Sequence, residues 1–172
     1  MTITGPTAEW EAWERRNAAL WAELDGLGRD AFVARMEELT AELPDGHPVA
    51  LFERAASCDS VGYTDRAVPL YREALKGYLP GERRRRAVIQ LASSLRASGH
   101  PEESVRLLEE ERERTSDHLD DALAAVLALG LTALGREREA VSVAVRALAP
   151  HLPRYQRSMA NYARLLVEPD EG

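Results

Sequence analysis

The sequence predicts an all-α fold built from repeated helical hairpins, and two observations carry this prediction. Gly62, Gly99 and Gly135 recur at intervals of 37 and 36 residues, a period typical of stacked helical repeats. No segment shows the sustained period-two alternation expected of a half-buried strand. A small residue stands seven positions before each of these glycines and another stands five positions after it: Ala55, Ala92 and Ala128, then Ala67, Ser104 and Ala140.

Composition limits the class of protein. A chain of 172 residues with 45% hydrophobic and 30% charged residues suits one domain with a sizeable core. The net charge of −7 opposes binding to phosphate backbones and to anionic membrane surfaces, so we expect no nucleic-acid partner and no membrane partner. The N-terminus lacks the basic start and apolar run of a signal peptide, and we expect a cytoplasmic location.

The first 47 residues predict an N-terminal helical pair. A helix over 7–24 carries all three tryptophans, Trp10, Trp13 and Trp21, at helical spacing. Glycines at 26 and 28 break the pattern, and a second helix over 30–43 follows. This pair is interpretable as a degenerate repeat.

Three hairpins follow, over 48–80, 81–116 and 117–153. The first begins at Pro48, which suits the opening turn of a helix because its missing N–H is not needed there. Its second helix contains Pro69, which we expect within the first turn, where proline costs least. Gly130 lies in the middle of an apolar helix, where glycine costs about 1 kcal/mol relative to alanine unless close packing requires it. Residues 154–172 predict a capping helix and a tail.

The small-residue pattern resembles the tetratricopeptide repeat (TPR). The hairpin over 48–80 carries it most fully, with Ala55, Gly62, Ala67, Tyr71, Ala74 and Pro80. The resemblance spans about residues 48–153 and looks like that of short stand-alone TPR proteins from high-GC bacteria. It implies a right-handed α-solenoid of about three TPR hairpins, and it implies a protein- or peptide-binding scaffold.

Residue chemistry argues against catalysis. The four histidines fall at turns, none pairs with another at helical spacing, and the only cysteine, Cys58, lies on an apolar stripe. The sequence contains no glycine-rich phosphate loop and no nucleophile elbow. We therefore expect no enzyme activity, no catalytic residue, no metal site and no cofactor.

The resemblance implies a binding groove lined by the first helix of each hairpin. Arg86, Gln90 and Ser93 share one helical face, and guanidinium, amide and hydroxyl donors suit a carboxylate or a peptide backbone. The candidate groove residues, mapped by the glycine positions, are Phe52, Asp59, Arg86, Ile89, Gln90, Ser93, Val126 and Leu129. The partner would be a protein or peptide whose identity the sequence does not specify.

Three alternatives stay open. The basic run 83–86 is either a solvated helix start paired with nearby acids, such as Glu82 and those at 109–113, or part of the groove. The tryptophan-rich helix either caps the first repeat or forms a self-association face, and the apolar third hairpin could also support a homodimer. A small-molecule sensor would require an enclosed pocket.

Overall fold

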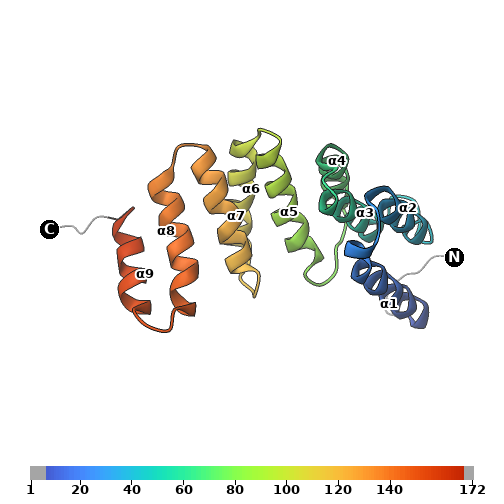
Figure 1. Ribbon diagram of the computed structural model, residues 1–172, viewed down its shortest axis with the longest axis horizontal. Helices are drawn as coiled ribbons and strands as arrows, with labels where there is room; N and C mark the ends of the chain where they lie inside the picture. Colours follow the sequence, from blue (N-terminus) through green and yellow to red (C-terminus); the bar gives the residue numbers. More distant parts are fainter. Residues whose placement is uncertain (1–6, 169–172) are drawn as a thin grey trace. The chain divides into compact units, whose positions relative to one another are not determined.

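The computed structural model describes residues 7–168. Residues 1–6, at the start of the segment examined for a signal peptide, lie outside this range, as do residues 169–172 of the predicted tail. The chain divides into two compact units, residues 1–87 and 88–172, and the helix labels are those of Figure 1.

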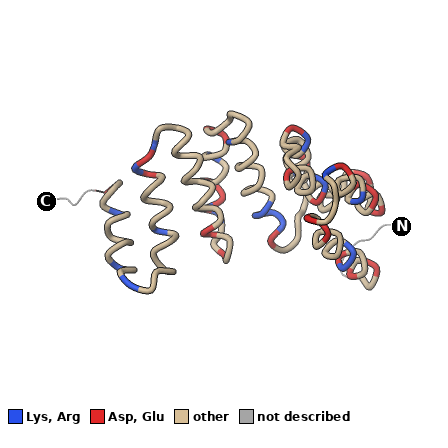
Figure 2. The backbone as a smooth tube through the Cα atoms, in the orientation of Figure 1, with Lys and Arg blue, Asp and Glu red and all other residues tan. Residues whose placement is uncertain are grey.

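The first unit contains four α-helices, a short 3-10 helix and the start of a fifth α-helix in its described part. The helices are α1 (Ala8–Ala22), η1 (Leu24–Gly26), α2 (Arg29–Thr40), α3 (Pro48–Ser60), α4 (Thr64–Ala74) and the beginning of α5 (Arg83–Ala97). Within this unit α1 packs on α2, α2 on α3, and α3 on α4. The basic run 83–86 is visible at the start of α5 (Figure 2).

The second unit begins within α5 and continues through four further α-helices among its described residues. They are α6 (Pro101–Arg114), α7 (Asp120–Ala133), α8 (Glu137–Leu148), the short η2 (Ala149–His151) and α9 (Gln156–Leu165). From α6 to α9, each helix again packs on its neighbour in sequence.

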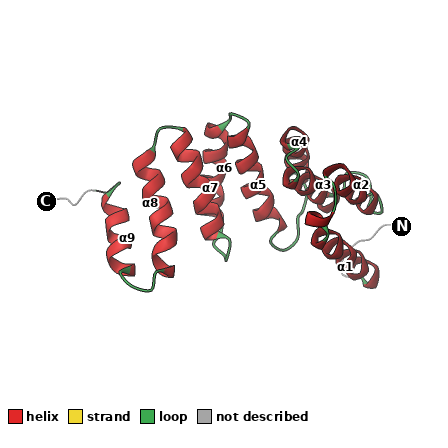
Figure 3. Cartoon of the chain, viewed as in Figure 1, coloured by secondary structure: helices red, strands yellow, loops and turns green. Residues whose placement is uncertain are grey.

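The predicted all-α fold of helical hairpins is confirmed. Between residues 7 and 168 every regular element is a helix, and Figure 3 shows only helices joined by loops. None of the described helices is both long enough and apolar enough to cross a bilayer.

The three periodic glycines end the first helix of each hairpin in the same way. Gly62, Gly99 and Gly135 have φ values of 88°, 86° and 71°, in the left-handed region that side chains with a Cβ rarely adopt. The residue after each glycine donates its backbone N–H to the carbonyl five residues earlier, at 2.8–2.9 Å. This bond is the helix-ending pattern known as the Schellman motif, so the glycine period reflects a repeated turn.

The small residues on either side of these glycines are buried in the packed hairpins. All six are buried, from fully enclosed to 9% exposed: Ala55, Ala67, Ala92, Ser104, Ala128 and Ala140. A small side chain lets two helix backbones approach closely, which explains why the spacing repeats together with the turn.

The tryptophan-rich helix packs into the core of the first unit. Trp13 is fully buried and donates its indole N–H to the Leu39 carbonyl at 3.0 Å. Trp10 stacks on Trp13, with ring centroids 5.4 Å apart, and Trp21 meets the Phe32 ring edge-on at 5.3 Å. These contacts favour the capping interpretation of the helix.

A buried ion cluster joins three helices of the first unit. The Arg83 guanidinium donates to the Glu53 carboxylate at 2.9 Å and to both Glu14 carboxylate oxygens at 2.9 and 2.6 Å. Glu53 is only 2% exposed and also accepts a bond from the Trp21 indole at 2.8 Å. The partners of Arg83 therefore come from α1 and α3, not from the acids at 109–113 proposed from the sequence.

Pro69 occupies a different position from the one predicted. Because α4 begins at Thr64, Pro69 is its sixth residue and lies in the second turn. A proline there removes the N–H that would bond to the Asp65 carbonyl. Both residues are exposed, so water can satisfy that carbonyl and the helix tolerates the loss.

Gly130 allows α6 and α7 to approach closely, which is the circumstance that justifies a glycine in the middle of a helix. A Cβ built on Gly130 would lie 2.9 Å from the Val105 Cγ2 atom. Val105 is 3% exposed and belongs to the apolar core of the second unit, so it has little room to move. Its neighbours in that core include Leu108, Leu127 and Leu131.

We predict that Arg83→Met destabilises the protein by about 3 kcal/mol, because it leaves the buried Glu53 carboxylate without its cation. Far-UV circular dichroism during urea unfolding measures the effect. Arg16→Met is the matched control, because Arg16 pairs with Glu42 on the surface with a side chain 52% exposed. That control should change the free energy of unfolding by less than about 1 kcal/mol. Equal effects of the two substitutions would contradict the structural role of the cluster.

We predict that Gly130→Ala destabilises the protein by about 1 kcal/mol, although alanine favours a helix over glycine by a similar amount. The same substitution in a Val105→Ala background should become stabilising, because the clashing methyl group is then absent. A double-mutant cycle in urea tests this change of sign. A stabilising effect in both backgrounds would rule out the proposed close approach.

Candidate functional site

Three of the eight groove candidates lie in the first unit, and two of them, Phe52 and Arg86, form a polar face over an aromatic ring. Phe52 is fully buried, and the Arg86 guanidinium lies over its ring at 5.3 Å from the centroid. The half-exposed Arg86 side chain also pairs with Glu82 at 3.6 Å, as one interpretation of the basic run predicts. Phe52 therefore supports Arg86 from below, and the guanidinium is the group that reaches solvent.

Asp59 is the third candidate in the first unit and is the penultimate residue of α3. It is half-buried and accepts a long hydrogen bond of 3.4 Å from the Tyr71 hydroxyl. Burial is the main cause that raises the pKa of Tyr71, and the nearby Asp59 carboxylate adds to it. The phenol therefore stays protonated and serves as a donor.

The remaining candidates come from α5 and α7 of the second unit and differ in exposure. Ile89 is 9% exposed and packs in the apolar core, so it offers no contact surface. Gln90 and Ser93 are half-buried, and the side-chain oxygen of Gln90 is enclosed without a hydrogen-bond partner in the described chain. Val126 packs partly against the core, whereas Leu129 is 54% exposed.

An uncharged stripe runs along the outer face of α7. Its members recur at helical spacing and are exposed apart from the half-buried Val126; they are Ala122, Ala125, Val126, Leu129 and Ala133. No charged residue occurs between Asp121 and Arg136. One exposed leucine is ordinary on a protein surface, so the distinguishing feature is the absence of charge from this whole face of α7.

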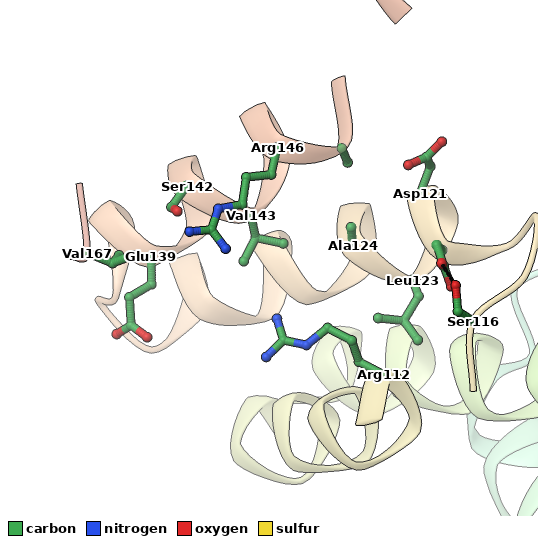
Figure 4. A pocket seen from close by; sticks show the side chains of 12 residues that line it. Arg112, Ser116, Asp121, Leu123, Ala124, Glu139, Ser142, Val143, Arg146 and Val167 are labelled. Carbon is green, nitrogen blue, oxygen red and sulfur yellow. Dashed lines mark hydrogen bonds between the residues drawn. The ribbon is translucent and has the colours of Figure 1, made fainter. Parts of the chain in front are cut away.

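A separate polar pocket of about 600 Å³ lies against α6, α7 and α8. Figure 4 shows Arg112 extending from α6 and Arg146 from α8 toward the same opening, beside Leu123 and Val143. Sequence reasoning did not single out these two arginines, because they lie on different helices and only the packing of the hairpins brings them together.

The acids that line this pocket bond to other residues. Glu139 pairs with Arg136 at 2.7 Å, an interaction that holds the pKa of its carboxyl below the usual range. Asp121 contacts the His151 ring at 2.8 Å, and Asp120 accepts a bond from Ser116 at 2.5 Å. Arg146 in turn pairs with Glu168 at 3.4 Å, so Arg112 is the guanidinium of this lining that would meet a carboxylate side chain in the recess.

The described residues contain no cluster suited to metal binding, and the cysteine of the chain is buried. No group of three or more histidine, cysteine, aspartate or glutamate side chains between residues 7 and 168 could hold a metal ion. Cys58 is 2% exposed, and burial raises the pKa of its thiol. A thiol in that setting is a small apolar core residue, not a nucleophile.

Comparison with known families agrees with this architecture. Residues 48–166 match the model of the family described as Tetratrico peptide repeat, a span that includes every α-helix from α3 to α9. No match is found among curated proteins or among solved structures. The match covers well over half of the chain, begins at Pro48 and includes the three repeated glycine turns. The chain therefore belongs to the tetratricopeptide repeat family.

Proposed function

We propose that this protein is a non-catalytic module that binds a protein or peptide segment along the first helices of its hairpins. Repeats of this family typically mediate protein interactions, which supports a binding scaffold. The contacts that we propose are the sequence-derived candidates that reach solvent: Asp59 and Arg86 within the first unit and, as a separate set, Gln90, Ser93, Val126 and Leu129 within the second.

The observation that best supports this proposal is the uncharged stripe of α7. Leu129 is 54% exposed in a segment of fourteen residues that carries no charge, within a chain in which 30% of residues are charged. Leaving such a surface in water forgoes the free energy of burying it, about 25 cal/mol per Å² of apolar area. A partner that covers the stripe would recover that free energy.

Polar groups beside the stripe would supply specificity. The enclosed Gln90 side-chain oxygen has no partner among the described residues, and Ser93 lies one turn further along α5. The exposed parts of the Gln90 and Ser93 side chains would form hydrogen bonds to a peptide backbone, whereas the enclosed Gln90 oxygen has no accessible surface for an incoming donor. In the first unit, Arg86 would offer a guanidinium to an acidic side chain or a terminal carboxylate.

Self-association is the second candidate function. Leu129 on α7 and the 50%-exposed Val141 on α8 both belong to the apolar third hairpin, which is one of the two dimer surfaces considered from the sequence. The other, the tryptophan-rich helix, has Trp13 fully buried within its own unit and so offers less free aromatic surface.

We predict that Leu129→Arg lowers the affinity for bound peptides by about tenfold or more, because it places an unpaired charge in the centre of the proposed contact. Peptides would first be selected from a displayed random library on the whole chain, then synthesised and measured by fluorescence anisotropy. Val141→Arg is the matched control, since it makes the same change at a similarly exposed site on α8.

The possible outcomes separate the candidates. Retained binding in Val141→Arg with loss in Leu129→Arg supports the proposed surface. Equal affinities for both variants, or a library that yields no binder, would contradict it. Light scattering on the same samples tests the second candidate, because a dimer that Leu129→Arg dissociates would indicate that another copy covers the stripe.

A further inference from the structure

The end of the second unit holds an apolar groove that the proposed function does not use. It has a volume of about 840 Å³ and lies where α8, η2 and α9 meet. Its lining comes from the end of α8, the connecting loop and one face of α9: Leu148, Leu152, Pro153, Arg154, Tyr155, Ser158, Met159 and Tyr162.

This groove concentrates exposed apolar side chains. Leu148, Tyr155 and Tyr162 are 54%, 73% and 61% exposed, which places them among the most exposed large apolar residues of the described chain. Tyrosine side chains present a broad apolar ring and a polar tip, and they are enriched where proteins meet partners. The cluster therefore has the composition of a docking surface, not of an ordinary solvated helix face.

Local hydrogen bonds fix the wall of the groove. The side-chain amide of Gln156 donates to the Pro150 carbonyl at 2.9 Å and to the Leu152 carbonyl at 2.8 Å, which ties the start of α9 to the preceding loop. Tyr155 has a φ of 68°, so its ring is presented from a left-handed backbone conformation that tyrosine rarely adopts. The groove is thus formed before any partner arrives, which lowers the entropic cost of binding.

The charge around the groove is opposite to that of the whole protein. The segment 148–162 that lines the groove contains Arg154 and Arg157 and no aspartate or glutamate, whereas Arg146 on α8 pairs with Glu168 and the chain carries a net charge of −7. Figure 2 shows the basic positions on α8, on the loop and on α9. Arg154 lines the groove and Arg157 is exposed one turn later, and no ion pair of either with a described residue is present.

We propose that this groove binds an acidic peptide segment of a partner protein, with apolar side chains seated against Tyr155 and Tyr162 and carboxylates facing Arg154 and Arg157. The inference rests on the proposed function as a protein-binding module, but it assigns a different surface and a partner of stated charge. A contact of the groove with the same groove of a second copy is disfavoured, because it would bring two sets of unpaired arginines together.

In the test, short random peptides are selected for binding to the whole chain. They are then sorted by whether their binding depends on the groove or on the uncharged stripe of α7. Each selected peptide is measured against the wild type, Leu129→Arg, Tyr162→Ser and the double variant Arg154→Ser with Arg157→Ser. We expect a class of peptides that loses about tenfold or more in affinity in the last two variants but not in Leu129→Arg. These peptides should be acidic with interspersed apolar residues, and their affinity should fall as salt is added.

Matched variants guard against indirect effects. Arg114→Ser removes an exposed arginine from α6 in the same unit and should leave the groove-dependent peptides bound. Circular dichroism on Tyr162→Ser should match the wild type, because the side chain is 61% exposed. The arginine double variant gives an independent readout, since it leaves the apolar lining intact apart from the Arg154 stem.

Several outcomes would overturn the inference. Groove-dependent peptides that are neutral or basic, or the absence of any such class, would do so even if Leu129-dependent peptides confirm the proposed function. A dimer that the arginine double variant dissociates would assign the groove to a second copy. If peptides bind the groove only after residues 169–172 are deleted, the occupant of the groove would be that acidic segment of the chain itself.

Discussion

The left-handed glycine turn is the constraint on which each hairpin depends. It allows the backbone N–H of the residue after the glycine to bond to the carbonyl five residues earlier. This hydrogen bond closes the end of the first helix of the hairpin. The chain then reverses, and the small residues before and after the turn are buried in the packed hairpin. A larger residue at the glycine would require a positive φ that costs about 1 kcal/mol or more.

Electrostatics act differently in the two units. In the first, Arg83 is enclosed with Glu14 and Glu53, so charge is part of the packing of α1, α3 and the start of α5. In the second, the described core cluster is apolar, but Glu111 of α6 is also buried, at 3% exposed, whereas the charges that line the pocket against α6, α7 and α8 lie at the surface. Replacing a surface charge there has little effect on stability, which leaves the arginines near the groove free to be selected for binding.

The fold could be predicted because its signals are local and repeated. Gly62, Gly99 and Gly135 each report a turn whose geometry depends only on a few neighbouring residues. The partners of Arg83 could not be predicted, since Glu14 is 69 residues away and the sequence offered closer acids. Among the groove candidates, Ile89 and Leu129 each follow the helical spacing of the predicted groove face in their own helix. Only the packing of the helices reveals that Ile89 is buried and Leu129 exposed.

The distribution of aromatic residues makes the two units separately visible to spectroscopy. Trp10, Trp13 and Trp21 all belong to α1, so tryptophan emission reports the environment of the first unit alone. The backbone signal of the helices reports both units together. If tryptophan emission and the helix signal change at different denaturant concentrations, the difference between the two midpoints measures how weakly the units are coupled. No added label is required. A native protein with this arrangement carries its own probe of cooperativity between neighbouring parts of a repeat array.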